Sequence, residues 1–259
     1  MDIFKDRAFT DGGSSFVDVL TAMGALPVFK GPTDAVPHGT TIVACKYRDG
    51  VLMAGDRRAT AGGWIASRDI QKVFPADDSS LIGAAGVAGL SQELVKVLQV
   101  ELEHYEKING SQLSLSGRAN RLSAIVRASM ALAFEDLPVI PIYCGFEAGQ
   151  GHIFSFDVVG GRYEEADFAA VGSGAVFARG SLKKSHDPGA ELVPALTAVI
   201  DALTDAADED SGTSGPDTGR DIWPVVYTAT AAGVARVDDE LLRQIYAEVA
   251  AKRSARWAR

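Results

Sequence analysis

A threonine that follows a glycine is the first feature of this chain that could perform chemistry. Thr40 comes after Gly39, in the segment His38-Gly39-Thr40-Thr41-Ile42-Val43. A threonine hydroxyl is a weak nucleophile unless a base lies beside it, and a chain cut before Thr40 would carry that base as its own α-amine. Because such an amine titrates at about 7.7 to 8.0, much of it is neutral near physiological pH and able to accept the hydroxyl proton.

Taken alone, the Gly39-Thr40 dipeptide is weak evidence for a nucleophile. A second pair of the same kind occurs at Gly212-Thr213, and threonine is favoured at the entry to a strand because of its β-branched side chain. A strand entry is therefore the better interpretation unless other residues support a reaction. Charged residues downstream provide that support.

Asp56 is expected to return to the neighbourhood of Thr40. It follows Gly55 at the end of an apolar run, and the turn Asp49-Gly50 joins that run to a strand beginning at Thr41. Asp-Gly between two β-rich runs is a strong hairpin signal, and Thr40 and Asp56 lie at nearly equal distances from the turn. A lone aspartate in such a place is more often a turn or capping residue.

Lys72 lies in an apolar context, between Ile70 and Val73-Phe74, where we expect a mostly buried strand. A buried ammonium group requires a counter-ion, and Asp56 is the predicted partner. A positive charge held there lowers the proton affinity of a nearby hydroxyl and amine. The ordinary alternative is a surface lysine whose stem covers apolar side chains.

Three further segments are compatible with roles around a nucleophile. Residues 83–89 are rich in glycine, which allows a peptide to approach closely, and the amide of Gly86 is suited to bond a developing oxyanion. A plain turn is the alternative there. Ser173 stands at a predicted helix start and is expected to be its N-cap, and residues 210–215 are expected to form a polar loop.

The elements that must position these residues form alternating blocks of strands and helices. Strands are predicted at residues 41–48, 51–55, 59–61, 64–66, 80–86, 139–146, 152–158, 163–171, 223–230 and 234–237. One helix ends at Asn109-Gly110, with an apolar face of Leu90, Leu94, Val97, Leu98, Leu102 and Tyr105. A second, ended by Pro138, carries Leu122, Ile125, Val126, Met130 and Ala133. Further helices are predicted after Gly174, over residues 191–208 and through Leu242, Ile245 and Val249. Such blocks favour an α+β fold of two packed sheets with helices outside.

Composition limits the classes of protein and of site. The chain of 259 residues is 47% hydrophobic, enough for the core of one domain, and its formal charge of −9 argues against a nucleic-acid binder. Cys45 and Cys144 both lie in predicted strands, which gives a disulfide framework little support and favours a reducing, cytoplasmic setting. The scattered histidines do not have the spacing of a metal site. No apolar run approaches the roughly 20 residues of a membrane helix, and the N-terminus does not resemble a secretory signal.

Residues 1–39 differ in composition from the rest of the chain. They contain Gly12-Gly13-Ser14-Ser15, a short apolar patch from Phe16 to Leu20, and Pro37. This pattern predicts a loosely structured leader that could form one short helix. A flexible tail and a removable propeptide are both compatible with it.

Together these motifs resemble the catalytic β-type subunits of the 20S proteasome, most closely the actinobacterial form. The similarity runs through nearly all of residues 39–253 and depends on several motifs in the same order. They are His38-Gly39-Thr40-Thr41-Ile42-Val43, Ala54-Gly55-Asp56-Arg57-Arg58-Ala59-Thr60, Arg68-Asp69-Ile70-Gln71-Lys72-Val73-Phe74, Glu101-Leu102-Glu103-His104-Tyr105-Glu106-Lys107, Val171-Gly172-Ser173-Gly174 and Asp205-Ala206-Ala207-Asp208-Glu209-Asp210. The resemblance implies an α+β fold, a four-layer αββα sandwich of the N-terminal-nucleophile hydrolase type.

The resemblance also implies a role for each candidate residue. Thr40 would be the N-terminal nucleophile of a threonine endopeptidase, released by self-cleavage of the bond between Gly39 and Thr40. Asp56 and Lys72 would be its supporting pair, and Gly86 would donate to the oxyanion. The hydrogen-bonded surroundings of the amine would be completed by Ser173, Asp210 and Thr213, the last in a place where the family often has serine. The substrate pocket would be lined by Ala59, Thr60, Ile70, Phe74, Ala84 and Ala88. These side chains are mostly apolar, which predicts a preference for hydrophobic residues on the acyl side of the cut.

Domains and partners follow from the same resemblance. Residues 1–39 would be a propeptide, and residues 40–259 the peptidase domain with a short C-terminal tail. The subunit would assemble with α-type subunits and other β subunits into an α7β7β7α7 barrel served by an ATPase ring. It would degrade unfolded or tagged proteins in the cytoplasm, with no cofactor, nucleic acid or membrane involved.

Two other functions remain open at this point. The peptidase of the simpler bacterial two-component protease also begins Thr-Thr-Ile-Val and forms hexameric rings without α-type partners. The length of the chain after residue 39 and the helices expected at residues 191–208 and 241–253 favour the 20S form. A non-catalytic ring subunit is the other alternative, and the joint presence of Thr40, Asp56 and Lys72 argues against it.

Overall fold

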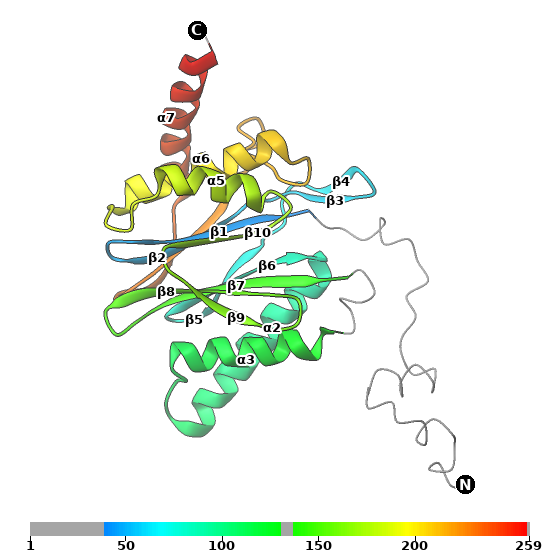
Figure 1. The fold of residues 1–259 in the computed structure, drawn as a ribbon, viewed down its shortest axis with the longest axis vertical. Coiled ribbons are helices and arrows are strands. Elements are labelled where there is room, and N and C mark those ends of the chain that lie inside the picture. The colour runs from blue at the N-terminus through cyan, green and yellow to red at the C-terminus, as the bar shows by residue number, and fades with distance from the viewer. Residues whose placement is uncertain (1–38, 131–136, 258–259) are drawn as a thin grey trace, which may run out of the picture. The chain divides into compact units, whose positions relative to one another are not determined.

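The computed structural model describes residues 39–130 and 137–257 of the chain. The predicted leader up to residue 38 and the predicted helix position Ala133 lie outside the described residues. Within the described part, two antiparallel sheets face each other between layers of helices (Figure 1). This is the α+β, αββα arrangement expected from the sequence.

The first sheet has the strand order β10-β1-β2-β11-β12, and every neighbouring pair is antiparallel. Its strands are β1 (Thr41–Tyr47), β2 (Gly50–Gly55), β10 (Phe168–Gly172), β11 (Val225–Thr230) and β12 (Gly233–Arg236). A separate two-stranded hairpin consists of β3 (Ala59–Ala61) and β4 (Trp64–Ser67). Helices α5 (Ala175–Ser185) and α6 (Leu192–Glu209) cover the outer face of this sheet, and α7 (Asp239–Trp257) packs against α6.

The second sheet has the order β5-β6-β7-β8-β9 and is also antiparallel throughout. Its strands are β5 (Val73–Asp77), β6 (Ser80–Gly86), β7 (Val139–Glu147), β8 (Gln150–Phe156) and β9 (Arg162–Glu165). Helices α2 (Ala88–Asn109) and α3 (Leu115–Ala128) cover its outer face. As predicted, α2 ends at Asn109-Gly110, where Gly110 is the C-cap and its left-handed backbone lets its N–H bond to the carbonyl of Glu106.

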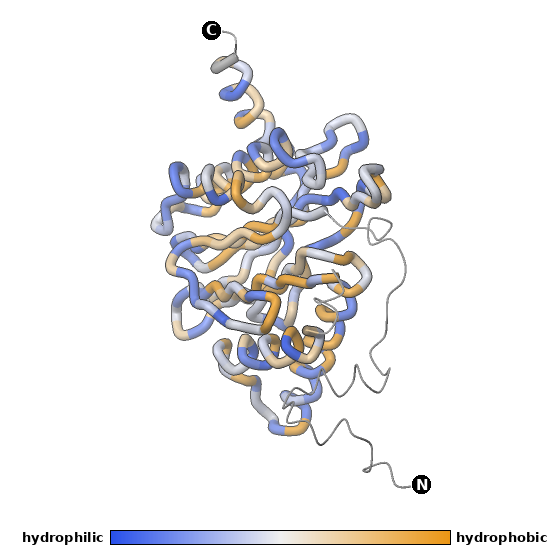
Figure 2. The backbone as a smooth tube through the Cα atoms, turned by 45° about the vertical axis from the view of Figure 1, so that its right-hand side comes forward, coloured by the Kyte–Doolittle hydropathy of each residue, from blue (hydrophilic) through white to orange (hydrophobic). Residues whose placement is uncertain are grey.

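In the described residues, three hydrophobic clusters fill the spaces between adjacent layers. Along β1, Val43 and Cys45 pack into the cluster below α5 and α6, whereas Ile42 and Ala44 pack into the cluster between the sheets. Alternate strand residues point to opposite faces, so a strand covered on both faces reads as a continuous apolar run. The third cluster joins the second sheet to α2 and α3. Figure 2 shows hydrophobic residues along the strands and an alternation of hydrophobic and hydrophilic residues along the helices.

The expected strand over residues 163–171 is wrong, because this segment forms β9 and β10 on different sheets. Glu165 ends β9 on the second sheet, and Phe168 begins β10 on the first. The chain crosses between the sheets at residues 166–167. The residues of β9 and of β10 both favour strands. A local sequence pattern does not reveal that the two strands belong to different sheets.

Two smaller expectations also need correction. The buried face of α2 includes Ser91 and Val95, whereas Val97 and Tyr105 are 38% and 37% exposed. The apolar stripe is therefore rotated from the one that the sequence predicts. Lys72 lies just before β5 rather than within a strand, although it is buried as expected.

Candidate active site

The strand pairing around Thr40 brings distant segments to one place. Thr40 directly precedes β1 and is 5% exposed. Its carbonyl accepts a hydrogen bond of 2.9 Å from the amide of Ser173, which follows β10. Gly172 has φ of 104°, and a Cβ on it would lie 2.0 Å from the Thr40 carbonyl oxygen. Only glycine fits this close approach, which sets Ser173 against Thr40.

The β1–β2 hairpin returns Asp56 to the start of β1. The amide of Asp56 donates to the carbonyl of Thr41 at 3.1 Å, and Asp56 Oδ1 accepts from the amide of Thr41 at 2.8 Å. Asp56 Oδ2 accepts from the amides of Arg58 at 2.9 Å and Ser214 at 3.1 Å. The side chain has no exposed surface. The carboxylate is therefore fixed by backbone donors on both oxygens, a strong arrangement for a buried charge.

Lys72 forms the expected ion pair with Asp56, at 2.6 Å from Nζ to Oδ1, with both side chains buried. Its ammonium also donates to the carbonyls of Arg58 at 2.6 Å and Gly39 at 3.1 Å. All three N–H donors of the ammonium are thus in use. Burial lowers the pKa of Lys72, and the nearby carboxylate of Asp56 offsets only part of that effect.

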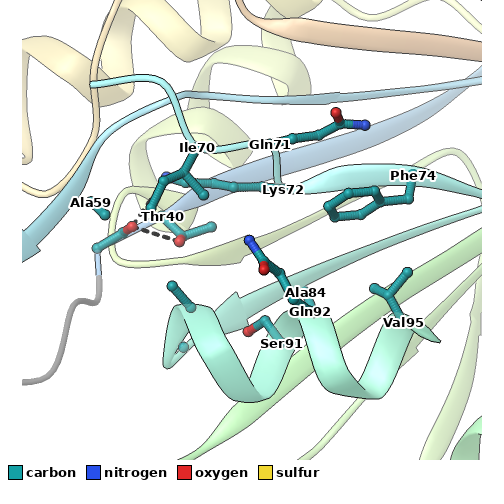
Figure 3. A pocket seen from close by; sticks show the side chains of 13 residues that line it. Thr40, Ala59, Ile70, Gln71, Lys72, Phe74, Ala84, Ser91, Gln92 and Val95 are labelled. Atoms are coloured by element: carbon teal, nitrogen blue, oxygen red, sulfur yellow. Dashed lines mark hydrogen bonds between the residues drawn. The ribbon is translucent and has the colours of Figure 1, made fainter. Parts of the chain in front are cut away.

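The carbonyl of Gly39 lies between Lys72 and the Thr40 hydroxyl. Thr40 Oγ1 donates to this oxygen at 2.5 Å, as the dashed line in Figure 3 shows. Gly86, the predicted oxyanion donor, lines the same cavity as Thr40. Its φ is 119°, and a Cβ there would lie 1.9 Å from the Pro138 carbonyl oxygen. Among the described residues, however, the Gly39 carbonyl accepts its hydrogen bonds from Lys72 and Thr40 and not from Gly86.

A second carboxylate, Asp210, follows the end of α6. Its Oδ2 accepts from Ser173 Oγ at 2.5 Å and from Thr213 Oγ1 at 2.6 Å, and its Oδ1 from the amide of Gly212 at 3.0 Å. Burial of Asp210 opposes ionisation, but these hydrogen bonds outweigh it, so the pKa of Asp210 lies below its usual value.

The expected N-cap role of Ser173 is wrong. The N-cap of α5 is Gly174, and no side chain caps that helix end. The hydroxyl of Ser173 donates to Asp210 instead, and it lies 3.5 Å from the backbone nitrogen of Thr40. Because its one proton points at the carboxylate, Ser173 Oγ accepts from the Thr40 N–H.

Two hydroxyl residues of the site, Thr41 and Ser214, were missed by reasoning from the sequence. Thr41 Oγ1 lies 2.5 Å from Thr213 Oγ1. Because Thr213 gives its proton to Asp210, Thr41 is the donor in this pair, and Thr41 itself accepts from the amide of Gly174 at 3.1 Å. The second threonine of the Thr40-Thr41 pair was the sequence feature that could have drawn attention to Thr41. Its bond to Thr213, however, depends on how residues 210–215 fold back toward β1.

The predicted substrate residues divide between two cavities. Five of them line a narrow cavity beside Thr40: Ala59, Ile70, Phe74, Ala84 and Ala88 (Figure 3). Thr60 lines a wider cleft of about 800 Å³ that also includes Thr40, Ser173 and Asp210. Polar side chains that the sequence did not single out, Gln71, Ser91 and Gln92, complete the narrow cavity.

Other chemistry has little support in the described residues. Both cysteines are free and buried, and burial raises the pKa of each thiol, so neither is a thiolate at neutral pH. No group of three or more histidine, cysteine or acidic side chains in residues 39–130 and 137–257 is arranged to hold a metal ion. None of the helices in these ranges combines the length and apolar content that a bilayer crossing requires.

Comparison with known proteins agrees with this geometry. The family model described as proteasome subunit matches residues 36–218. A proteasome subunit beta of Streptomyces griseus is 48% identical over 254 residues, covering 94% of this chain and 90% of the relative. Proteins of the same name from Stackebrandtia nassauensis and Jonesia denitrificans are also 48% identical, covering 93% and 98% of this chain and 91% and 88% of those relatives.

The αββα sandwich with a threonine directly before strand β1 is the fold of N-terminal-nucleophile hydrolases. Within that class, the chain belongs to the proteasome subunit family. The resemblance inferred from the sequence motifs is thereby confirmed.

Proposed function

We propose that this chain is the catalytic β subunit of a 20S proteasome, a threonine endopeptidase with Thr40 as its nucleophile. One observation carries the proposal. The Thr40 hydroxyl lies 2.5 Å from the carbonyl oxygen of Gly39, and the same oxygen accepts from Lys72. A nucleophile, the bond before it and a buried cation are thus gathered at one point.

The first reaction in this proposal is removal of residues 1–39 as a propeptide, which leaves residues 40–259 as the peptidase domain. Thr40 Oγ attacks the Gly39 carbonyl carbon, the peptide C–N bond breaks, and the hydroxyl proton passes to the departing nitrogen. An ester then joins Gly39 to Thr40 Oγ. Water hydrolyses this ester to a Gly39 carboxylate and a free hydroxyl, and the nitrogen released in the first step remains as the new α-amine of Thr40. The Lys72 ammonium stabilises negative charge on the carbonyl oxygen during the attack.

The second reaction is cleavage of substrate peptides by the same groups. The α-amine of Thr40 takes the proton of its own hydroxyl, and the oxygen attacks the peptide carbonyl. The peptide C–N bond then breaks, the leaving nitrogen takes that proton, and water hydrolyses the acyl ester on Thr40 Oγ to a carboxylate and the free hydroxyl. Asp56 fixes Lys72, whose charge favours the deprotonated hydroxyl. Ser173, Asp210 and Thr213 orient the amine, and the amide of Gly86 receives the substrate oxyanion. Residues lining the cavities, Ala59, Thr60, Ile70, Phe74, Ala84 and Ala88, contact the substrate.

Assembly completes the proposal. The subunit works inside a cytoplasmic α7β7β7α7 barrel, with α-type partners, other β subunits and an ATPase ring that delivers unfolded or tagged proteins. The names of the relatives, proteasome subunit beta, support this assignment. Seven-fold particles in electron micrographs are expected, whereas six-fold particles without a second subunit type would contradict the barrel.

N-terminal sequencing after co-expression with an α-type subunit tests the enzyme proposal directly. The expected product begins at Thr40 and hydrolyses peptides. Thr40→Ala should remain uncut and inactive, whereas Thr40→Ser, which keeps a hydroxyl, should still be processed. A product that begins at Met1 and has no peptidase activity would overturn the proposal.

A further inference from the structure

The narrow cavity beside Thr40 is lined by both apolar and polar side chains. Ala59 and Ala84 contribute only methyl groups, whereas α2 contributes Ala88 and Val95 together with the hydroxyl of Ser91 and the amide of Gln92 (Figure 3). The mostly apolar residues that the sequence places in this pocket predict a preference for hydrophobic substrate side chains. The polar groups of Ser91 and Gln92 were not among the residues on which that expectation was based.

Ser91 is unusual because its hydroxyl is buried without a hydrogen-bond partner. The residue is 8% exposed, and its Oγ makes no hydrogen bond to the described residues. Its amide donates at 2.8 Å to the carbonyl of Val87, the N-cap of α2, so the backbone N–H is satisfied and the hydroxyl is left without a partner. A buried polar group without a partner costs about 1–3 kcal/mol, which makes the position unfavourable unless something else bonds it.

The location of Ser91 indicates what that partner is. The other buried unpartnered atoms in the described residues are the Nε atoms of Arg57, Arg58 and Arg118, and each of those guanidinium groups has other hydrogen bonds. The Ser91 hydroxyl has none and faces a cavity that opens at the nucleophile. The cavity is narrow, with a volume of about 10 Å³. A side chain that enters it must therefore pass close to Ser91.

We propose that Ser91 is a specificity-determining residue, whose hydroxyl bonds an acyl-side residue ending in a hydroxyl or an amide. This inference rests on the proposed peptidase function of Thr40. The Ser91 hydroxyl donates to an amide or hydroxyl oxygen and accepts from an N–H or O–H, so it suits both substrate types. A purely aliphatic side chain of the same shape leaves Ser91 unpaired, and a site built to bond a polar group discriminates against such an analogue.

Matched peptide pairs test this proposal in the assembled particle. The substrates are fluorogenic peptides that differ only at the acyl-side residue, asparagine against leucine and threonine against valine. The measured quantity is the polar-to-apolar ratio of kcat/KM. Ser91→Ala is expected to lower this ratio by about 3- to 10-fold, the loss of one hydrogen bond. Ser91→Thr keeps the hydroxyl and should keep the ratio.

Controls separate selectivity from folding. Ser185→Ala removes an exposed hydroxyl on α5 that bonds only the Ser181 carbonyl, and it should leave both rates unchanged. Cleavage before Thr40, read by N-terminal mass, reports whether each variant is folded. If Ser91→Ala is not processed, Ser91→Cys, which keeps the volume with a weaker donor, should lower the ratio in the same direction.

The outcomes distinguish this inference from the proposed function. A processed, active Ser91→Ala variant, or Ser91→Cys where alanine is not processed, whose ratio stays within twofold of the parent for both peptide pairs would overturn the role of Ser91 alone. A parent chain that is neither processed nor active on any peptide would overturn the peptidase function, and the role of Ser91 with it. A lowered ratio that Ser91→Thr restores supports the proposal.

Discussion

The two carboxylates of the site stand in contrasting surroundings. Asp56 is 1% exposed and is paired with the ammonium of Lys72. Asp210 is partly exposed, and its closest partners are the neutral hydroxyls of Ser173 and Thr213. The first carboxylate holds a fixed charge next to the Gly39 carbonyl. The second holds a set of hydroxyl protons around the Thr40 nitrogen.

This difference predicts how strongly substitutions around Asp56 and around Asp210 should affect the stability of the protein. A buried ion pair that loses one member leaves a charge with neither solvent nor partner, which is costly. A carboxylate with access to water can replace a lost hydroxyl donor with a water molecule. We therefore expect the Asp56 side to be rigid and intolerant, and the Asp210 side to tolerate substitution with graded losses.

Among substitutions around the two carboxylates, Lys72→Met should cause the largest loss in the free energy of unfolding. It leaves the Asp56 carboxylate buried without its counter-ion, and we expect a loss of about 3–5 kcal/mol in the free energy of unfolding. Urea unfolding measures it, with every chain in the Thr40→Ala background so that self-cleavage does not change the covalent molecule. The matched control is Lys183→Met at an exposed position on α5, expected to stay within about 0.5 kcal/mol. Similar losses for both variants would contradict the contrast.

Thr213→Val should come next. Thr213 has no exposed surface, and the change leaves the Thr41 hydroxyl and one oxygen of Asp210 short of a partner. We expect a loss of about 1–3 kcal/mol, again from urea unfolding in the uncut background. Thr213→Ser keeps the hydroxyl and removes one methyl, so its loss should be only about 1 kcal/mol. If the serine and valine variants lose the same free energy of unfolding, the hydrogen bonds that join Thr41, Thr213 and Asp210 do not stabilise this part of the site.

Part of this contrast was predictable from the sequence. The Asp49-Gly50 turn fixes the hairpin that returns Asp56 to Thr41, and a lysine among apolar neighbours requires the counter-ion that Asp56 supplies. Both inferences need only local pattern and the cost of burying charge. The same reasoning recovers most strands and most helices, since each has its own periodicity, but not the division of residues 163–171 between β9 and β10.

The Asp210 side was not predictable in this way. Ser173 stands at a helix start, and local geometry favours an N-cap, but a carboxylate from the end of α6 takes its hydroxyl. The bond between Thr41 and Thr213 joins residues far apart in the chain. Such contacts depend on how loops fold back, and no local pattern specifies them. The resemblance to a known family named Ser173, Asp210 and Thr213, but not Thr41.

Asp210→Asn should reveal a pH dependence that belongs to this side. The pKa of Asp210 is lowered from 3.8 because hydrogen bonds to its ionised form outweigh the effect of burial. A carboxyl with a lowered pKa stabilises the fold above its unfolded pKa and loses that contribution as the pH falls through the folded value. The stability difference between Asp210→Asn and the parent should therefore be largest near neutrality and shrink below about pH 4. A difference that stays constant into strong acid would contradict this account.

Ser173→Ala should have the smallest effect on stability and a specific effect on Asp210. The hydroxyl lies at the exposed edge of the site, so water can take its place and the loss should be about 0.5–1.5 kcal/mol. Among the hydrogen bonds to Asp210, the one from Ser173 contributes most to lowering the pKa. Its removal should move that pKa back toward the ordinary value, so that the acid limb of the unfolding curve shifts to higher pH. Ser214→Ala, whose hydroxyl lies 3.4 Å from Asp56 and whose amide still donates to the same oxygen, should leave the acid limb in place. A shift of equal size in both variants would mean that the two carboxylates respond alike, and the contrast between a fixed charge and an adjustable hydroxyl network would fail.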